Sequence, residues 1–348
     1  MIGRRSLLLA GAALPASAYG QCVINSPAAD ACRGGVRNAG PAGQTLDLNF
    51  MFPGSLDSRV TFTRASTATY TDASGTIQTA AINAPRWDYA GGVLRGLLIE
   101  EARTNLFLNS ATLGTQGVTV TAQAYTLSFY GAGTVTKSGV ATGALVGTGA
   151  GQRVSQTFTP TAGTVTCTVT GSVMNAQLEA GSWVTSWVPT TGATATRAQD
   201  FATMPVGGTP WFVTTTGTWF AEFILTSPTV DFGRVIGVLP GPGSPSPLFV
   251  NGAGNAGSFD GIIIQTANTM TSGTLGKAAS AFGAGTGKIC LNGGAVVSAA
   301  QNGQNFATAA FLQCIAGTAS TENASGYIRR VSYWPRSLSN AELQSVTT

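Results

Sequence analysis

Apolar and polar residues alternate in short segments along most of the chain. In "TVTCTVT" (164–170), Thr occupies every second position, and Val165, Cys167 and Val169 stand between. Successive side chains of a β-strand point to opposite faces, so this pattern predicts a half-buried strand in which Cys167 is a small buried residue. Many short strands separated by turn residues are typical of a β-sandwich or barrel. The alternation recurs, bounded by Gly, Pro, Asn or Ser, at 59–63, 117–130, 153–159, 218–225 and 327–334.

Signals for helices are few, and the clearest one lies at the C-terminus. In "LSNAELQSV" (338–346), Ser339 and Glu342 form a capping-box pattern, which predicts one short helix. No repeat of fixed period is present, which disfavours a solenoid or propeller. The sequence therefore predicts an all-β protein of two tandem antiparallel β-sandwiches of the jelly-roll type, followed by a short C-terminal helix.

The composition supports a folded β-protein with unusually little charge. Charged residues make up 9% of the 348 residues, where an ordinary globular protein has about 25%. Thr and Gly take their place, with 48 and 46 residues, and the chain also holds 16 Phe, 7 Tyr and 6 Trp. That apolar content is enough for a core, so disorder is excluded, and the β-branched Thr favours sheet.

Several kinds of chemistry are excluded by what the sequence lacks. The chain contains no His, which excludes a Ser-His-Asp or Cys-His catalytic site and a His-ligated zinc. Lys and Arg are scattered, so no basic stripe fits a nucleic-acid backbone. A phosphate-binding loop is also absent, and "GAGTG" (283–287) lacks the strand-to-helix context of a dinucleotide site.

The first 20 residues read as an export signal or an N-terminal anchor. Arg4 and Arg5 precede the apolar run Leu7–Leu14, and Ala16–Ala18 matches a small-residue cleavage site. The paired arginines resemble a twin-arginine signal, and a retained N-terminal helix is the alternative. The apolar run is too short for a bilayer, so no membrane span is predicted.

The remaining chain divides at two breaks. Residues 21–45 lack periodicity and predict a linker or arm. A second break, rich in Pro and Gly, lies near 200–210 and divides the strands into units at 46–203 and 204–348. Each unit has a suitable size for one β-sandwich.

The five cysteines form no C-x-x-C motif, so neither a metal knuckle nor a thioredoxin-type site is supported. In an exported protein, Cys22 and Cys32 are candidates for a disulfide that staples the arm. Cys290 and Cys314 are candidates for a disulfide across neighbouring strands.

Two stretches resemble known families. "LDLNFMFPGSLDSRVTFTRASTATYTDASGTIQTAAINAPRWDY" (46–89), "GLLIEEARTNLFLNS" (96–110) and "NAQLEAGSWVTSWVPTTGATATRAQD" (175–200) look like a module of phage and prophage tail-fibre, head-fibre and other receptor-binding proteins. Residues 211–348, with the closing "GYIRRVSYWPRSLSNAELQSV" (326–346), resemble the concanavalin A-like, laminin-G-like lectin and glucanase sandwich. These resemblances imply a fold and a virion setting more directly than an activity, because such sandwiches host enzymes, lectins and structural modules.

Charged and amide residues of the first unit gather in its motif-bearing segments. In a chain with so few charges, buried Arg–carboxylate bonds that lock the first sandwich are the favoured role, with binding as the alternative. In "APRWDYAGG", Arg86 and Asp88 share one face of a strand and would form a structural ion pair. The candidates for these structural bonds are Arg64, Arg86, Asp88, Glu100, Arg103 and Asn105.

Sugar-binding candidates are the aromatic and amide side chains, because sugars bind flat aromatic faces beside amides and carboxylates. For all four aromatic candidates the patterns favour core packing and leave a stacking surface as the alternative. The Gly-rich loop at 250–261 suits sugar hydroxyls or a Ca²⁺ ion, with a solvated turn as the plainer interpretation. The candidates are Trp87, Tyr89, Trp183, Trp187, Asn251, Asn255 and Asp260.

Glycosidase chemistry needs two carboxyl groups across the scissile bond, and Glu222 and Asp231 are the nearest pair in the second unit. The Glu-x-Asp-x-x-Glu strand motif of the related glucanases is absent from "AEFILTSPTVDFG". The sequence thus predicts no catalytic residues, no resident metal or cofactor, and a virion-associated protein that binds cell-surface polysaccharide beside other virion proteins. A depolymerase and a secreted bacterial lectin are the alternatives, and a homo-oligomer, a trimer by analogy with phage fibres, is expected.

Overall fold

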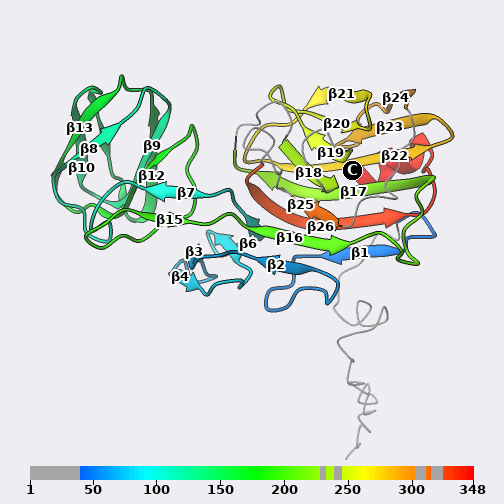
Figure 1. Ribbon diagram of the computed structural model, residues 1–348, viewed down its shortest axis with the longest axis horizontal. Helices are drawn as coiled ribbons and strands as arrows, with labels where there is room; N and C mark the ends of the chain where they lie inside the picture. Colours follow the sequence, from blue (N-terminus) through cyan, green and yellow to red (C-terminus); the bar gives the residue numbers. More distant parts are fainter. Residues whose placement is uncertain (1–39, 228–232, 239–244, 302–310, 315–323) are drawn as a thin grey trace, which may run out of the picture. The chain divides into compact units, whose positions relative to one another are not determined.

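Strands make up nearly all of the regular structure in the computed structural model (Figure 1), which describes residues 40–227, 233–238, 245–301, 311–314 and 324–348. Each strand pair in the sheets is antiparallel, and the single helix among the described residues is α1 (Asn340–Thr347). The expected class, an all-β protein of antiparallel sandwiches with a short C-terminal helix, is confirmed.

The largest sheet combines strands from both ends of the chain. Its centre is the 10-residue strand β17, which pairs with β22 on one side and β26 on the other, as Figure 1 shows. In spatial order its strands are β24 (Val297–Ala300), β23 (Thr286–Leu291), β22 (Leu275–Gly283), β17 (Thr216–Leu225), β26 (Gly326–Trp334), β6 (Val93–Ile99) and β5 (Trp87–Ala90), and β1 (Leu46–Asn49) also pairs with β26.

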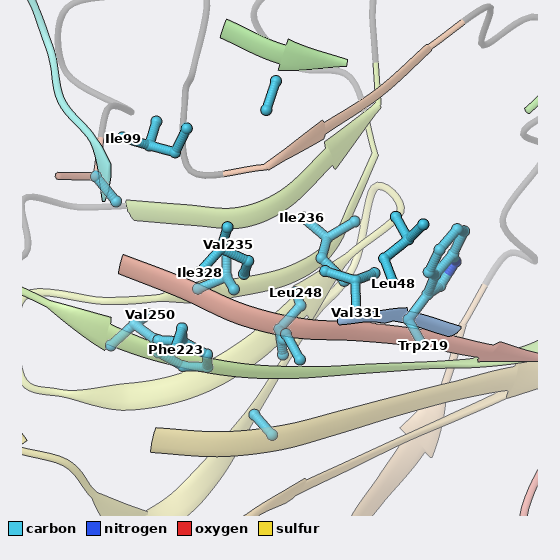
Figure 2. Packing of buried hydrophobic residues seen from close by; sticks show 14 of the residues in the cluster. Leu48, Ile99, Trp219, Phe223, Val235, Ile236, Leu248, Val250, Ile328 and Val331 are labelled. Atoms are coloured by element: carbon cyan, nitrogen blue, oxygen red, sulfur yellow. The ribbon is translucent and has the colours of Figure 1, made fainter. Parts of the chain in front are cut away.

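A second sheet faces this one across a shared hydrophobic core. Figure 2 shows Leu48, Phe223 and Val331 of the first sheet beside Ile236 and Leu248 of the second, and all five side chains are buried. The two sheets therefore form a sandwich, called the large sandwich below. The strands of the second sheet, in spatial order, are β2 (Thr61–Thr63), β16 (Phe201–Pro205), β25 (Phe311–Cys314), β18 (Gly233–Val238), β19 (Ser246–Val250), β20 (Asn255–Phe259) and β21 (Ile263–Thr269).

Strand β17 is buried on both faces because the helix covers its outer side. Trp219 and Phe223 point into the sandwich core, whereas Phe220 packs in a separate cluster with Trp334 and with Leu343 of α1. The helix begins with the predicted capping box: the Ser339 hydroxyl accepts from the Glu342 N–H, and the Glu342 carboxylate accepts from the Ser339 N–H. The cap thus places the start of the helix where its apolar face meets the sheet.

Two further sheets form a smaller sandwich with its own core. Leu127 and Phe129 of one sheet and Val135, Val165 and Cys167 of the other are fully buried in one cluster. The predicted segment 164–170 is thus a strand with Cys167 buried, while 117–130 contains two strands. The strands are, in the first sheet, β12 (Gly149–Phe158), β9 (Tyr125–Gly131) and β14 (Met174–Ala180), and in the second, β11 (Gly143–Val146), β10 (Thr134–Gly139), β13 (Gly163–Thr170) and β8 (Gln116–Val120).

The strand pairing crosses the boundary expected between residues 203 and 204. That boundary falls inside β16, and β1 and β6 from the N-terminal part pair with the C-terminal strand β26. The small sandwich lies in sequence between β6 and β16, as an insertion in the large sandwich. Two short ladders complete the sheets: β7 (Arg103–Asn105) with β15 (Ala195–Arg197), and β3 (Ala68–Thr71) with β4 (Ile77–Ala80).

We predict that the fragment 204–348 does not fold alone, because it lacks β1, β2, β6 and most of β16 and exposes the edges of β25 and β26. The fragment 103–197, which keeps all strand pairs of the small sandwich, should unfold cooperatively. Circular dichroism during thermal unfolding, with the chain 41–348 as reference, measures both. A cooperative transition of 204–348 at the temperature of the reference would contradict the pairing.

Candidate functional site

Five charged side chains form a buried network where the small sandwich is inserted. Asp200 lies 3.0 Å from Arg64 and 2.5 Å from Arg86 across their closest N–O pairs. Arg86 also lies 2.8 Å from Glu100, and Arg197 lies 3.5 Å from Glu100 and 3.8 Å from Asp200. The five side chains are at most 5% exposed, so the bonds form in a region of low polarity.

The residues of this network come from segments far apart in the sequence. Arg64 follows β2, Arg86 precedes β5 and Glu100 follows β6. Arg197 is the last residue of β15, and Asp200 directly precedes β16. The structure thus brings together three of the predicted structural residues, Arg64, Arg86 and Glu100, and adds Arg197 and Asp200. Those two residues stand in the quoted segment 175–200, so their clustering with the other charged motif residues was a usable signal.

Glu100 connects the network to a loop of the small sandwich. Its carboxylate accepts hydrogen bonds from the Ser186 N–H at 2.7 Å and from the Ser186 hydroxyl at 2.6 Å. Burial alone would raise the pKa of Glu100, but the charges of Arg197 and Arg86 and the bonds from Ser186 lower that pKa to about 2. Glu100 is therefore a carboxylate whose charge is already compensated.

The other predicted structural residues hold the insertion in place. Arg103 pairs with Glu101, and its guanidinium lies 4.4 Å from the centroid of the Trp183 ring. The buried Asn105 amide donates to the carbonyls of Ala176 and Val188 at 2.9 and 2.8 Å. Trp183 is therefore covered by an arginine and is not a free stacking surface.

Next to the network lies a cavity of about 200 Å³, called the Arg153 cavity below. Its wall comes from β3, β4, β5, β6 and β26 of the outer segments and from β9, β12 and the 184–187 loop of the insertion. The wall combines hydroxyl groups, aromatic rings, two carboxylates and one guanidinium. The lining residues are Thr69, Tyr70, Thr71, Ile77, Asp88, Leu98, Glu100, Tyr130, Arg153, Val184, Thr185, Ser186, Trp187, Thr226 and Tyr327.

Asp88 is the second carboxylate of the cavity, and its bonds differ from the expected ion pair with Arg86. Its oxygens accept from the Thr71 N–H at 2.6 Å and the Tyr327 hydroxyl at 2.8 Å, while Arg86 pairs with Asp200 and Glu100. Burial raises the pKa of Asp88, and burial together with this carboxylate holds the pKa of Tyr327 well above its usual range. Tyr327 therefore stays protonated and donates to Asp88.

Arg153 is the guanidinium of the cavity and was not singled out from the sequence. It donates to the Thr185 carbonyl at 2.6 Å and to the Ser128 hydroxyl at 2.9 Å, and it lies 5.9 Å from the centroid of the Tyr130 ring. Its Nε–H is buried and makes no hydrogen bond. The signal for this residue was weak: a single charge within the strand segment 153–159.

Of the four aromatic sugar-binding candidates, Trp187 alone lines the cavity. Its backbone carbonyl accepts from the Thr69 hydroxyl at 2.5 Å, and its indole N–H donates to the Ser110 hydroxyl at 3.2 Å. Trp87 is buried and donates to the Phe50 carbonyl at 3.0 Å, and Tyr89 packs against the same core. Trp87 and Tyr89 therefore pack in or against the core, as the sequence pattern favoured.

The amide and acidic candidates of the 250–261 loop close turns. The Asn251 side chain accepts from the Ala253 and Asn255 N–H groups, and the Asn255 side chain donates to the Thr266 carbonyl. Asp260 accepts from the Ile262 N–H at 3.1 Å. Within the described ranges, no three His, Cys, Asp or Glu side chains gather closely enough to hold a metal ion, so the calcium suggestion stays a prediction.

The expected disulfide between Cys290 and Cys314 is wrong. Cys290 is a free, buried thiol whose sulfur lies 3.2 Å from the Thr347 hydroxyl of α1. Its strand β23 belongs to one sheet of the large sandwich, while Cys314 ends β25 of the other sheet. Alternation along a strand does not tell which strands are neighbours, and this explains the error. Cys22 and Cys32, like the signal-like segment 1–20, lie outside the described residues.

Of the two carboxylates considered for glycosidase chemistry, Glu222 does not line the cavity. Glu222 on β17 is paired with Arg329 on β26 at 2.7 Å. Asp231 lies outside the described residues. Among the described residues, no helix has the length and apolar character needed to cross a bilayer.

No protein-family model and no curated protein matches the chain. Solved structures with partial similarity include CBM40 of the Ruminococcus gnavus IT-sialidase bound to α2,3-sialyllactose, with 17% identity over 39% of this chain and 83% of that chain, at a TM-score of 0.33. A Trypanosoma rangeli sialidase mutant displaying trans-sialidase activity shows 13% identity over 42% of this chain and 25% of that chain, at a TM-score of 0.34. The leech intramolecular trans-sialidase complexed with 2,7-anhydro-Neu5Ac shows 12% identity over 42% and 27%, at a TM-score of 0.33.

We predict that Glu100 makes stability depend on acidic pH. Its pKa of about 2 in the folded protein lies below the ordinary value of 4.5, so its contribution is complete above pH 4.5 and is lost as the pH falls toward 2. The shift corresponds to about 3 kcal/mol of unfolding free energy. Glu100→Gln should lower stability at pH 7 by a similar amount and flatten the decline between these pH values, as measured by urea unfolding.

Glu342→Gln is the control for this experiment. Glu342 also has a pKa lowered to about 2, but its side chain is partly open to solvent, so screening limits its effect to about 1 kcal/mol. The raised pKa of Asp88 means that this residue makes the folded protein more stable as the pH falls. Asp88 is present in both variants, so its effect cancels when their pH profiles are compared. An unchanged pH profile for Glu100→Gln would show that the buried network does not depend on this carboxylate.

Proposed function

We propose that the chain is a non-catalytic glycan-binding protein and that the Arg153 cavity is its binding site. The observation that carries this proposal is the mixture of groups in the cavity wall: the rings of Tyr70, Tyr130 and Trp187 stand beside hydroxyls and the Asp88 carboxylate. Sugars are recognised by aromatic faces together with a few well-placed hydrogen-bonding groups.

The size of the cavity supports a small ligand. A volume of about 200 Å³ lies below the range of about 300–1,000 Å³ typical of drug-sized ligands. We infer that one sugar ring, such as a terminal residue of a polysaccharide, occupies it. Each Asp88 oxygen accepts one protein hydrogen bond and keeps a lone pair for a sugar hydroxyl.

Binding without turnover fits the state of the two carboxylates. Glu100 and Asp88 have pKa values displaced in opposite directions, a pattern that also occurs in acid–base catalysis. However, the Glu100 oxygens are already engaged by Arg86, Arg197 and Ser186. A nucleophile or base needs a free oxygen, so Asp88 is the one carboxylate of the cavity wall left to meet a ligand.

Removal of an aromatic wall should weaken binding. We expect Tyr130→Ala to lower affinity about tenfold, since an aromatic contact contributes about 1 kcal/mol or more. Tyr89→Ala, which removes a partly buried tyrosine outside the cavity, should bind as the unaltered chain does. The full chain is screened on an array of bacterial surface oligosaccharides, and affinities are then measured by titration calorimetry.

Thermal unfolding of both variants controls for folding. Failure of every glycan to bind, or equal affinity of Tyr130→Ala and the unaltered chain, would refute the cavity as the site. A reducing-end assay on the bound polysaccharide should detect no release. Release that Asp88→Asn abolishes would replace the binding proposal with the depolymerase alternative.

The proposed setting is a phage or prophage particle, with attachment to host-surface glycans as the role. Its support is the resemblance of 46–89, 96–110 and 175–200 to receptor-binding modules, and the alternative is a secreted bacterial lectin. Mass spectrometry of purified particles should detect peptides from residues 46–348. Peptides found in the culture supernatant alone would favour the secreted lectin, and intact Met1–Ala18 in particles would exclude signal processing.

A further inference from the structure

Arginines of the described chain differ in whether a carboxylate lies beside them. Most have a carboxylate oxygen within 4.0 Å, whereas Arg153 and Arg95 have none among the described residues. In a protein with 14 Asp and Glu, pairing is selective, so an arginine without a carboxylate is informative. The paired arginines are Arg59, Arg64, Arg86, Arg103, Arg197, Arg329, Arg330 and Arg336.

Arg153 and Arg95 both adjoin the Arg153 cavity. Arg153 is part of its wall. Arg95 lies with its guanidinium 5.0 Å from the centroid of the Tyr327 ring, and Tyr327 lines the cavity. Both side chains are partly exposed, so neither charge is sealed in the core. Two arginine charges that have no carboxylate beside them therefore lie at this one cavity.

The geometry of Arg153 favours an anionic partner. Its two terminal nitrogens donate to neutral acceptors, the Thr185 carbonyl and the Ser128 hydroxyl, which fix the guanidinium without neutralising it. Its Nε–H is buried without a partner. An unmade hydrogen bond at a charged group is costly, and the planar guanidinium suits a carboxylate.

The two carboxylates of the cavity wall, Glu100 and Asp88, do not prevent an anionic ligand from contacting Arg153. The charge of Glu100 is compensated by Arg86 and Arg197, which belong to a network of three arginines and two carboxylates. Asp88 receives hydrogen bonds from Thr71 and Tyr327 and remains an acceptor for a sugar hydroxyl. An acidic sugar carries both a carboxylate and hydroxyls, so it uses Arg153 and Asp88 together.

We propose that the Arg153 cavity selects sugars that carry a carboxylate, with Arg153 contacting that carboxylate and Asp88 accepting a ring hydroxyl. This inference rests on the proposed glycan-binding function and names the class of ligand. Arg95 contributes a longer-range attraction. Uronic acid residues of bacterial surface polysaccharides have the required chemistry.

The test compares acidic oligosaccharides with their carboxyl-reduced counterparts, in which the carboxylate is replaced by a hydroxymethyl group. The full chain is applied to an array of bacterial capsular uronate oligosaccharides printed in both forms. We expect at least tenfold weaker binding of the reduced forms. Binding of the acidic forms should also weaken from 50 to 500 mM NaCl, because a charge contact in a partly open cavity is screened by salt.

Variants assign the selectivity to Arg153. Arg153→Gln should lose the preference for acidic forms, while Arg95→Gln should reduce it about two- to threefold, as expected of a more distant charge. Arg59→Gln, which removes an arginine from an exposed pair with Asp57, should keep the preference. Thermal unfolding checks each variant, and Arg153→Lys, which keeps the charge, should retain part of the preference if Arg153→Gln does not fold.

The outcomes separate this inference from the function on which it rests. Equal binding of acidic and reduced forms would overturn carboxylate selection and leave glycan binding intact. A preference that persists in Arg153→Gln would overturn the role of Arg153. No binding to any oligosaccharide, at low or high salt, would refute the proposed function itself.

Discussion

Asp200 accepts hydrogen bonds from Arg64, Arg86 and the backbone N–H of Glu100, and all of these groups are buried. Removing charged groups from water costs several kcal/mol for each ion, and a buried pair that loses one partner is destabilised by about 3–5 kcal/mol. The segments around residues 64, 86, 100 and 200 can therefore assume their positions only together. This requirement fixes both ends of the insertion to the large sandwich.

The Arg153 cavity depends on the same requirement. Ser186 reaches the network through Glu100, and its neighbour Trp187 is held by the Thr69 hydroxyl. These bonds place the 184–187 loop of the insertion against β3 of the outer segments, and that contact forms one wall of the Arg153 cavity. A cavity whose walls are fixed by charge-assisted bonds is preorganised, so less ordering entropy opposes ligand binding.

Local patterns in the sequence predicted many of the strands but not which strands pair with one another. Alternation predicted β13 and β17, and the spacing of Ser339 and Glu342 predicted α1. Pairing of β1 with β26, and the separation of Cys290 from Cys314 into different sheets, depend on contacts between residues hundreds of positions or several strands apart. Such contacts produce no periodic pattern in the sequence. For the same reason the sequence did not indicate that Arg153 and Tyr327 lie in one cavity wall with Asp88 and Trp187.

An arginine without a carboxylate partner is more informative in this chain because the chain has so few charged residues. On an ordinary surface, with about a quarter of residues charged, an arginine without a carboxylate is unremarkable, because solvent and neighbouring charges compensate it. This chain has 18 Lys and Arg and 14 Asp and Glu, and its described arginines are largely held by carboxylates. Arg153 is instead held by neutral oxygens beside a cavity, with one N–H left over. No carboxylate of the described residues lies within 4.0 Å of Arg153, and this is why we propose that its compensating anion belongs to the ligand.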